Sequence, residues 1–205
     1  MNKFLFNSIS AACLATASLS AESNFQLNID GKVFEVSPGQ EQKLTLPDGT
    51  THTITLKQKE YHTFSSDFFS FQHKNSFSPS KADLGSGINQ TMMVSPLGTG
   101  VLIQEYKTID PTMLIDLMIQ ELTKEEVSAG YELKVIDRER KLKDGTVLKG
   151  KVAITSLDGE KWEKEVYAQG SNGKGVLVVT FIEENNKKTD SDILKTFWDS
   201  LQTRP

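Results

Sequence analysis

The chain has 205 residues, and its 23 basic and 27 acidic side chains give a formal net charge of −4 at pH 7. This mild acidity gives no reason to expect a nucleic-acid partner, because nucleic-acid binding needs a basic face. A chain of this length buries about 70% of its unfolded surface, so a hydrophobic core is expected to stabilise it.

The first twenty residues are predicted to be an export signal. Lys3 provides a positive start, and residues 4–19 are mostly apolar or small. Ser18 and Ser20 are small residues at the two positions that a signal peptidase reads, so we expect cleavage before Ala21. The sequence therefore predicts a protein of the periplasm or the external medium.

Cys13 is the only cysteine and lies inside this signal. The mature chain would then have no thiol, which excludes disulfides and thiolate metal sites. A lipid on Cys13 is the less favoured alternative, because Ser10, Ala11 and Ala12 fit a lipid-attachment box poorly. No later apolar segment reaches the ~20 residues of a membrane helix, so no membrane span is expected after signal removal.

Residues 21–65 are predicted to form a small antiparallel β module. Asp30 and Gly31 are a strong two-residue hairpin signal, and a turn there places Leu27 opposite Phe34 on one face. Alternating apolar residues and further turn signals continue this pattern through four strands. The module has few large apolar residues, so we expect it to depend on packing against the main domain.

Residues 66–205 are predicted to form the main domain. A strand begins within residues 68–71, and residues 75–87, rich in Ser, Pro and Gly, are expected to be a loop. Residues 88–94 and 101–106 are predicted to be two strands joined by a turn that contains Pro and Gly.

A long helix is predicted over residues 111–127. Asp110 is a good N-cap, and Pro111 stands at the first helical position, where its missing N–H costs nothing. Apolar residues recur behind them at helical spacing and form a wide stripe, which is typical of a helix that lies flat on a sheet. Gly130 is expected to end the helix.

Strands and charged segments alternate after this helix. Residues 131–136 are predicted to be a strand, and the charge cluster at 138–143 is expected to be a solvated loop. Residues 146–156 and 160–168 are predicted to be two further strands. The second is polar enough that we expect it at or near a sheet edge, where charges discourage sheet-to-sheet association.

The turn between these last two strands has two possible lengths. A two-residue loop at Asp158 and Gly159 would place Ile154 beside Glu163. A three-residue loop with Gly159 in the left-handed region would instead pair Ile154 with Trp162. We predict the three-residue loop.

Residues 175–183 are predicted to be the central strand. Six of them, from Val176 to Ile182, are apolar on both alternating faces, which is typical of a strand covered on both sides. A last helix is predicted to start at Thr189 with Asp192 in a capping-box-like pattern. The fold class is therefore α+β: an antiparallel sheet with a helix on each face, an α/β/α sandwich, preceded by the small β module.

The search for chemistry finds no catalytic constellation. His52, His62 and His73 have no spacing that aims two imidazoles at one metal from a single element, so we expect neither a metal nor a cofactor. His62 and His73 are the first choice if the protein is a hydrolase with an unrecognised serine. The Gly-Ser-Gly at residues 85–87 lacks the strand-to-helix setting of an activated nucleophile.

Aromatic residues are unusually dense in residues 61–77. Most apolar side chains go inside, so core and inter-module packing is the ordinary interpretation. The functional alternative is a partner surface. Its candidate residues are Tyr61, Phe64, Phe68, Phe69, Phe71 and Phe77.

The order of signals over about residues 67–203 resembles the PsbP-like superfamily, including the DcrB-type periplasmic proteins. The resemblance is carried by Phe69-Ser70-Phe71, the strand 103–106 that enters the Asp110-Pro111 helix, the strand 176–182, and the closing helix with Phe197 and Trp198. It implies an α/β/α sandwich and a non-catalytic accessory role through partner proteins. It supplies no catalytic motif.

We therefore expect an exported, non-catalytic accessory or binding protein of the cell envelope that acts through protein–protein contacts. Its partner would be another envelope or secreted protein. Two alternatives stay open: a secreted hydrolase with a Ser/His site, and an envelope-structural subunit that joins its neighbours through the edge of the first β module.

Overall fold

The computed structural model describes residues 25–204. The chain divides into two compact units, one ending at Gln58 and the other beginning at Lys59. The expected export signal, Cys13 and the expected cleavage site before Ala21 lie outside the described residues. Within the described range no helix is both long and apolar enough to cross a membrane.

The first unit consists of two β-hairpins. Their strands are β1 (Phe25–Ile29), β2 (Lys32–Val36), β3 (Glu41–Thr45) and β4 (Thr51–Thr55). The predicted register is confirmed, because Leu27 pairs with Phe34 across a turn in which Asp30 and Gly31 both have positive φ. Only Val36 and Leu44 are buried hydrophobic side chains in the described part of this unit, so its core is small.

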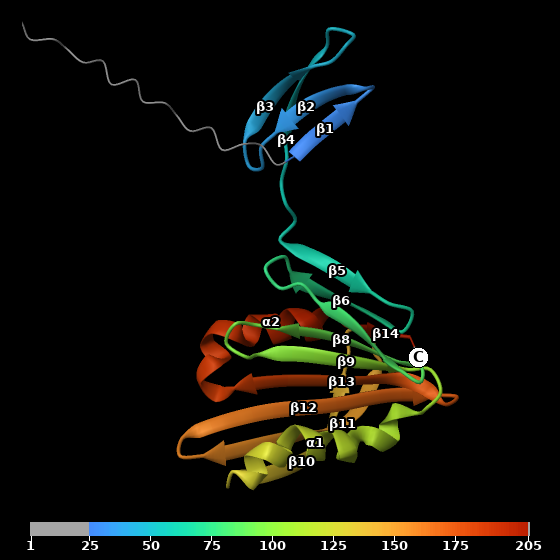
Figure 1. Cartoon of the computed structure of the whole chain (residues 1–205), viewed down its shortest axis with the longest axis vertical. Helices are drawn as coiled ribbons and strands as arrows, with labels where there is room; N and C mark the ends of the chain where they lie inside the picture. The colour runs from blue at the N-terminus through green and yellow to red at the C-terminus, as the bar shows by residue number, and fades with distance from the viewer. Residues whose placement is uncertain (1–24, 205) are drawn as a thin grey trace, which may run out of the picture. The chain divides into compact units, whose positions relative to one another are not determined.

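A seven-stranded antiparallel sheet forms the centre of the second unit (Figure 1), in the order β10-β11-β12-β13-β9-β8-β7. The strands are β7 (Ser80–Gly85), β8 (Ile88–Val94), β9 (Gly100–Tyr106), β10 (Glu132–Lys141), β11 (Val147–Leu157), β12 (Glu160–Ser171) and β13 (Lys174–Glu183). The predicted central strand is β13, which occupies the middle of the sheet. Its residues from Val176 to Val179 have no exposed surface.

The two faces of the sheet have different covers. One carries α1 (Ile115–Ser128), which follows the 3-10 turn Pro111–Leu114. The other carries α2 (Lys187–Ser200), which follows the 3-10 turn Glu184–Asn186, and a small sheet of β5 (Tyr61–Ser65), β6 (Phe69–Lys74) and β14 (Gln202–Thr203).

Alternate residues of β13 contact these two covers. Leu177 packs in one buried cluster with Ile119 of α1, and Val178 packs in the other with Phe197 of α2. Figure 1 shows the sheet between the two helices. The predicted α/β/α sandwich is therefore confirmed, and the unit is α+β.

The two helices begin in different ways. Asp110 is the predicted N-cap of the first, and its carboxylate accepts a hydrogen bond from the Thr112 amide at 3.0 Å. The cap predicted at Thr189 is wrong, because α2 begins at Lys187 and has no side-chain cap. Asp190 in its first turn is buried and accepts a hydrogen bond at 2.5 Å from Ser95 Oγ. A tertiary contact with the β8–β9 turn thus positions this helix start.

Three strand predictions near the sheet edges are wrong. Residues 80–85 are the edge strand β7 rather than a loop, and the charge cluster continues β10 as far as Lys141. The strand β12 is interior, between β11 and β13, although it is rich in charge. Partner side chains on neighbouring elements explain this placement: Lys164 pairs with Glu126 and Glu165 with Arg140.

The β11–β12 turn is the two-residue form, so the three-residue prediction is wrong. Asp158 and Gly159 both have positive φ, as a type I′ turn requires, and Ile154 pairs with Glu163. The Glu163 charge beside Ile154 is paired, because its carboxylate accepts a hydrogen bond at 3.0 Å from the Lys187 ammonium.

The strand β5 belongs with the second unit. It pairs with β6, and Phe64 stands opposite Phe71. The predicted boundary at residue 65 placed these five residues in the first module, whereas the compact units divide after Gln58. The reason is the apolar face of β5, which reaches the core only through this pairing.

Candidate functional site

The six aromatic candidates lie in different environments. Phe69 and Phe71 are 0% and 1% exposed and belong to the core beneath α2. They are therefore unavailable to a partner in this structure. Phe64, Phe68 and Phe77 are partly buried against the same core, and Tyr61 is exposed. Of the six, Phe68 lines a polar hollow.

This hollow, called the basic hollow below, has a volume of about 420 Å³. Residues 65–68 of the β5–β6 turn line one side, and Lys81, Asn89, Glu105 and Lys107 line the other. Ser66 shapes the turn, because its hydroxyl accepts hydrogen bonds at 3.2 Å from the amides of the second and third residues after it.

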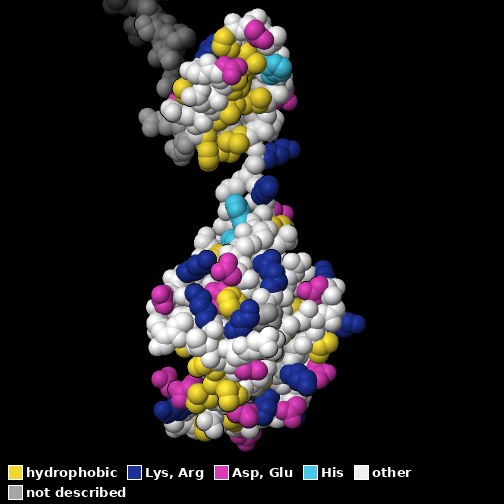
Figure 2. All heavy atoms as spheres, turned by 90° about the vertical axis from the view of Figure 1, so that its right-hand side faces the viewer, with side chains coloured by type: hydrophobic (Ala, Val, Ile, Leu, Met, Phe, Trp, Pro, Cys, Tyr) yellow, Lys and Arg dark blue, Asp and Glu magenta, His cyan; other side chains and the backbone are white. Residues whose placement is uncertain are grey.

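Four cations lie in or beside the basic hollow and the β5–β6 turn. Lys81 Nζ lies 4.8 Å from the centre of the Phe64 ring, and Lys174 Nζ lies 5.8 Å from that of Phe68. The guanidinium of Arg204 donates a hydrogen bond to the backbone carbonyl of residue 66 at 3.4 Å. Lys107 is the fourth. Figure 2 faces this end and shows Lys and Arg side chains around an apolar side chain, with Asp or Glu side chains among them.

None of these four cations forms an ion pair with a carboxylate of the described chain. The hollow itself is lined by two of these lysines, Lys81 and Lys107, and by two acids, Asp67 and Glu105. Cations near ring faces are attracted by the ring quadrupole, which holds them in place without neutralising them.

Glu105 lies at the base of the basic hollow. It is only 6% exposed, because it shares a face of β9 with the buried Val101 and Ile103. Within residues 25–204 its carboxylate has neither a hydrogen bond nor an ion pair. The other buried acid, Asp190, has Ser95 as its donor. Among the described residues, the buried side-chain polar atoms without a hydrogen bond belong to Thr99, Arg140 and Trp198, so the Glu105 carboxylate reaches the solvent of the hollow.

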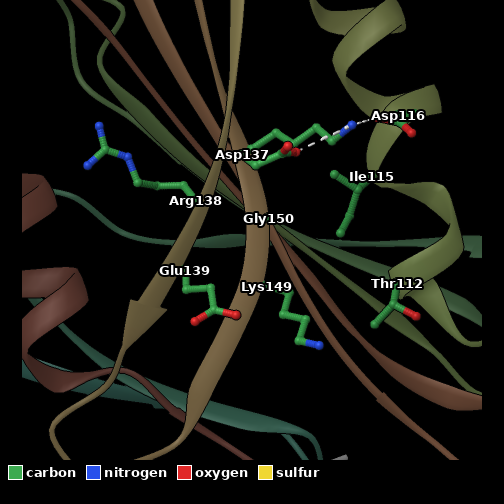
Figure 3. A pocket seen from close by; sticks show the side chains of 9 residues that line it. Thr112, Ile115, Asp116, Asp137, Arg138, Glu139, Lys149 and Gly150 are labelled. Carbon is green, nitrogen blue, oxygen red and sulfur yellow. Dashed lines mark ion pairs between the residues drawn. The ribbon is translucent and has the colours of Figure 1, made fainter.

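A second hollow of about 420 Å³ lies beside α1, at the β10–β11 end of the sheet (Figure 3). Here Lys151 Nζ lies 2.5 Å from Asp116 Oδ1 and 3.7 Å from Asp137 Oδ1. The hydrogen bond to Asp116 raises the pKa of Lys151. Figure 3 shows this ion pair, and Arg138 points away from it. The central cation of this hollow is thus already neutralised.

Arg140 has a structural role on the opposite face of β10. Its guanidinium makes two hydrogen bonds of 2.7 Å to Glu165 and lies 4.1 Å from the Trp198 ring of α2. Burial raises the pKa of Tyr167, whose ring is 5.3 Å from the same guanidinium. Bidentate pairing and stacking of this kind fasten the edge strand to the helix.

The histidines lie in two different units. His62 and His73 face each other across β5 and β6, with ring centres 6.0 Å apart, while His52 belongs to β4 of the first unit. His73 is buried, and its Nδ1 lies 3.0 Å from the Lys74 carbonyl. In the described chain no serine hydroxyl hydrogen-bonds to either ring of the pair, and no three metal-ligating side chains cluster.

Most residues of the basic hollow carry no distinguishing pattern in the sequence. Lys81 was assigned to a loop, and Lys107 and Lys174 lie at the ends of strands without a distinguishing pattern. Glu105 did carry a signal. Its position two residues after Ile103 on an alternating strand places a carboxylate on the buried face.

The second unit thus belongs to the class of antiparallel α/β/α sandwiches. No protein-family model matches the chain, and no curated protein sequence does. The chain is similar to the solution structure of cyanobacterial PsbP (CyanoP) from Synechocystis sp. PCC 6803, with a TM-score of 0.48 and 12% identity over 71% of this chain and 93% of that one.

It is also similar to a crystal structure from Bacteroides thetaiotaomicron VPI-5482, with a TM-score of 0.38 and 12% identity over 72% of this chain and 50% of that one. Similarity at this level assigns no function.

Proposed function

We propose that the chain is an exported, non-catalytic accessory protein of the cell envelope that binds an acidic segment of a partner protein through the basic hollow. The observation that carries this proposal is the group of four cations without carboxylate partners in or beside the basic hollow, two of which lie over the Phe64 and Phe68 rings. An acidic segment is the partner chemistry that complements it.

The contrast within the sheet supports a binding role for this end. Elsewhere, partly buried cations such as Arg140 and Lys187 have carboxylate partners in their own chain. The four cations at the basic hollow are exposed and have no carboxylate partner. Clustered charge of one sign steers an oppositely charged partner and sets its orientation, while a flanking aromatic side chain supplies apolar contact area.

The proposal is tested by binding of a short oligoglutamate peptide, measured by fluorescence anisotropy with the purified mature chain. The double variant Lys81→Glu/Lys107→Glu is expected to weaken binding by about tenfold or more, because it reverses charge at two lining positions. The control is Lys134→Glu/Lys149→Glu, which reverses two exposed, unpaired lysines of β10 and β11.

Equal losses in the two double variants would show that only net charge matters, and would overturn the assignment of the site. The absence of any binding by the wild type at about 0.01 M salt, where electrostatic attraction is least screened, would overturn the acidic partner itself.

Export needs a separate test. We expect the mature protein to begin at Ala21 when it is isolated from the periplasmic fraction, as read by amino-terminal sequencing. An intact chain confined to the cytoplasm would contradict the envelope location.

A further inference from the structure

Two imidazole rings lie side by side on the small sheet of the second unit. His62 on β5 and His73 on β6 stand directly opposite each other in the antiparallel register, and their ring centres are 6.0 Å apart with 27° between the ring planes. Directly opposite residues of an antiparallel pair share a face. The pair is formed by two strands, so the spacing of histidines within one element does not indicate it.

The His73 ring is fixed in position and in tautomer. It is 8% exposed and packs edge-to-face with Phe71, whose ring contacts Phe197 of α2. Its Nδ1 lies 3.0 Å from the backbone carbonyl of Lys74. A carbonyl oxygen only accepts hydrogen bonds, so Nδ1 carries the proton and Nε2 presents a lone pair.

The Nε2 atom of His73 is open to a ligand. Within residues 25–204 it has no hydrogen-bond partner, and it is not among the buried polar atoms that lack one, which belong to Thr99, Arg140 and Trp198. This nitrogen therefore reaches the solvent. His62 is exposed beside it, and in the described chain its ring nitrogens have no hydrogen bond either.

The separation of the two rings matches the ligand spacing of a transition-metal ion. Histidine nitrogens bind Zn²⁺ at about 2.0–2.1 Å, so the centres of two rings on one ion lie no more than about 6.5 Å apart. The observed 6.0 Å is within this limit, and rotation of the exposed His62 side chain can bring one nitrogen of each ring onto an ion. A proton that a backbone carbonyl holds on the other ring nitrogen is also typical of metal-binding histidines.

The two ligands select the class of ion. Imidazole suits Cu²⁺, Ni²⁺ and Zn²⁺, whereas Ca²⁺ and Mg²⁺ require several oxygen ligands. Among residues 25–204, no third His, Cys, Asp or Glu joins the pair. Water would therefore complete the coordination, and the ion would exchange with the solvent.

We infer that His62 and His73 together bind one divalent transition-metal ion of the class that imidazole ligates, such as Zn²⁺ or Cu²⁺. The site lies at the opposite end of β5 and β6 from the turn that lines the basic hollow, so it goes beyond the proposed function and does not depend on it. A bound ion would join the edge strand β5 to β6 where the second unit begins.

The experiment measures the binding of ZnCl₂ and of CuCl₂ to the purified mature chain, without a histidine tag, by isothermal titration calorimetry. The wild type is expected to bind one ion. His62→Ala and His73→Ala are each expected to weaken binding by about tenfold or more, because each removes one of the two protein ligands. The matched control is His52→Ala, which removes an exposed histidine of the first unit and is expected to bind like the wild type.

Circular dichroism checks that each variant is folded. His62 is exposed, so His62→Ala keeps the test valid even where replacement of the buried His73 disturbs the fold. Unchanged binding by His62→Ala would overturn the inference, and so would an equal loss in His52→Ala.

Thermal unfolding gives an independent measurement. An ion that binds only the folded chain raises its melting temperature, so ZnCl₂ is expected to stabilise the wild type and to have a smaller effect on His62→Ala. The inference would be wrong if MgCl₂ stabilised the wild type equally, or if neither ZnCl₂ nor CuCl₂ bound at about 1 mM.

Discussion

At the β10–β12 end of the central sheet, partly buried charges meet partners within the chain, whereas at the β7–β9 end they do not. Lys164 is buried and pairs with Glu126 of α1, and Arg140 holds Glu165 with two hydrogen bonds. Glu105 is as buried as Lys164 and has no partner in the described residues.

Both ends lie in one sheet, so the difference concerns which charges have partners within the chain. At the β10–β12 end, the partly buried charges are neutralised by side chains of the same chain. A charge without a partner in the chain is balanced by solvent or by a bound group. Three predictions test this comparison.

The largest effect is expected at the paired end. Glu126→Ala leaves Lys164 buried without its carboxylate, and breaking a buried pair in this way costs about 3 kcal/mol of unfolding free energy. Urea unfolding followed by circular dichroism measures it. The control Glu125→Ala removes an exposed acid from the same helix and is expected to change stability by less than about 0.5 kcal/mol. Similar values for the two variants would mean that the pair contributes nothing.

A smaller effect of opposite sign is expected at the unpaired end. Glu105→Gln keeps the shape of the side chain and removes its buried charge, so it should stabilise the fold by about 1 kcal/mol. Thermal unfolding detects this as a higher melting temperature. A destabilised variant would show that Glu105 has a structural partner. The difference in charge pairing between the two ends of the sheet would then be wrong.

The smallest effect concerns Lys151 in the second hollow. Its hydrogen bond to Asp116 raises its pKa above the ordinary lysine value of 10.5, so the folded state holds this proton more tightly than the unfolded state does. The stabilisation is fully present below the unfolded pKa and is lost as pH rises through the folded one.

The difference in unfolding free energy between the wild type and Asp116→Asn should therefore shrink above pH 10.5. Urea unfolding of both proteins across this range measures it. A difference that is constant with pH would show that the ion pair contributes no charge-dependent stability.

The framework of the fold could be predicted because its signals are local. The turn at Asp30 and Gly31, the N-cap at Asp110 and the doubly apolar run in β13 each follow from neighbouring residues. The wrong predictions share a different cause. The charges of Glu163 and Glu165 predicted a strand at or near the sheet edge. In the structure they lie on an interior strand, because Lys187 and Arg140, which are distant in sequence, pair with them.

The candidate site could not be predicted in the same way. Lys81, Asn89 and Glu105 come from three separate strands, and only the strand order places them around one hollow. The dense aromatics in residues 61–77 did indicate the right region. Their division into the core residues Phe69 and Phe71 and the marginal Phe64 and Phe68 depended on tertiary packing.

The sequence by itself determined the class of the fold, because hydrophobic periodicity and turn chemistry act over a few residues and are written in consecutive positions. Tertiary structure alone decided which charges are neutralised, because ion pairing depends on distances across strands and helices. Lys164 has a carboxylate partner, and Glu105 has no ion-pair partner in the described residues. This difference follows from where each residue lies in the fold and not from its residue type.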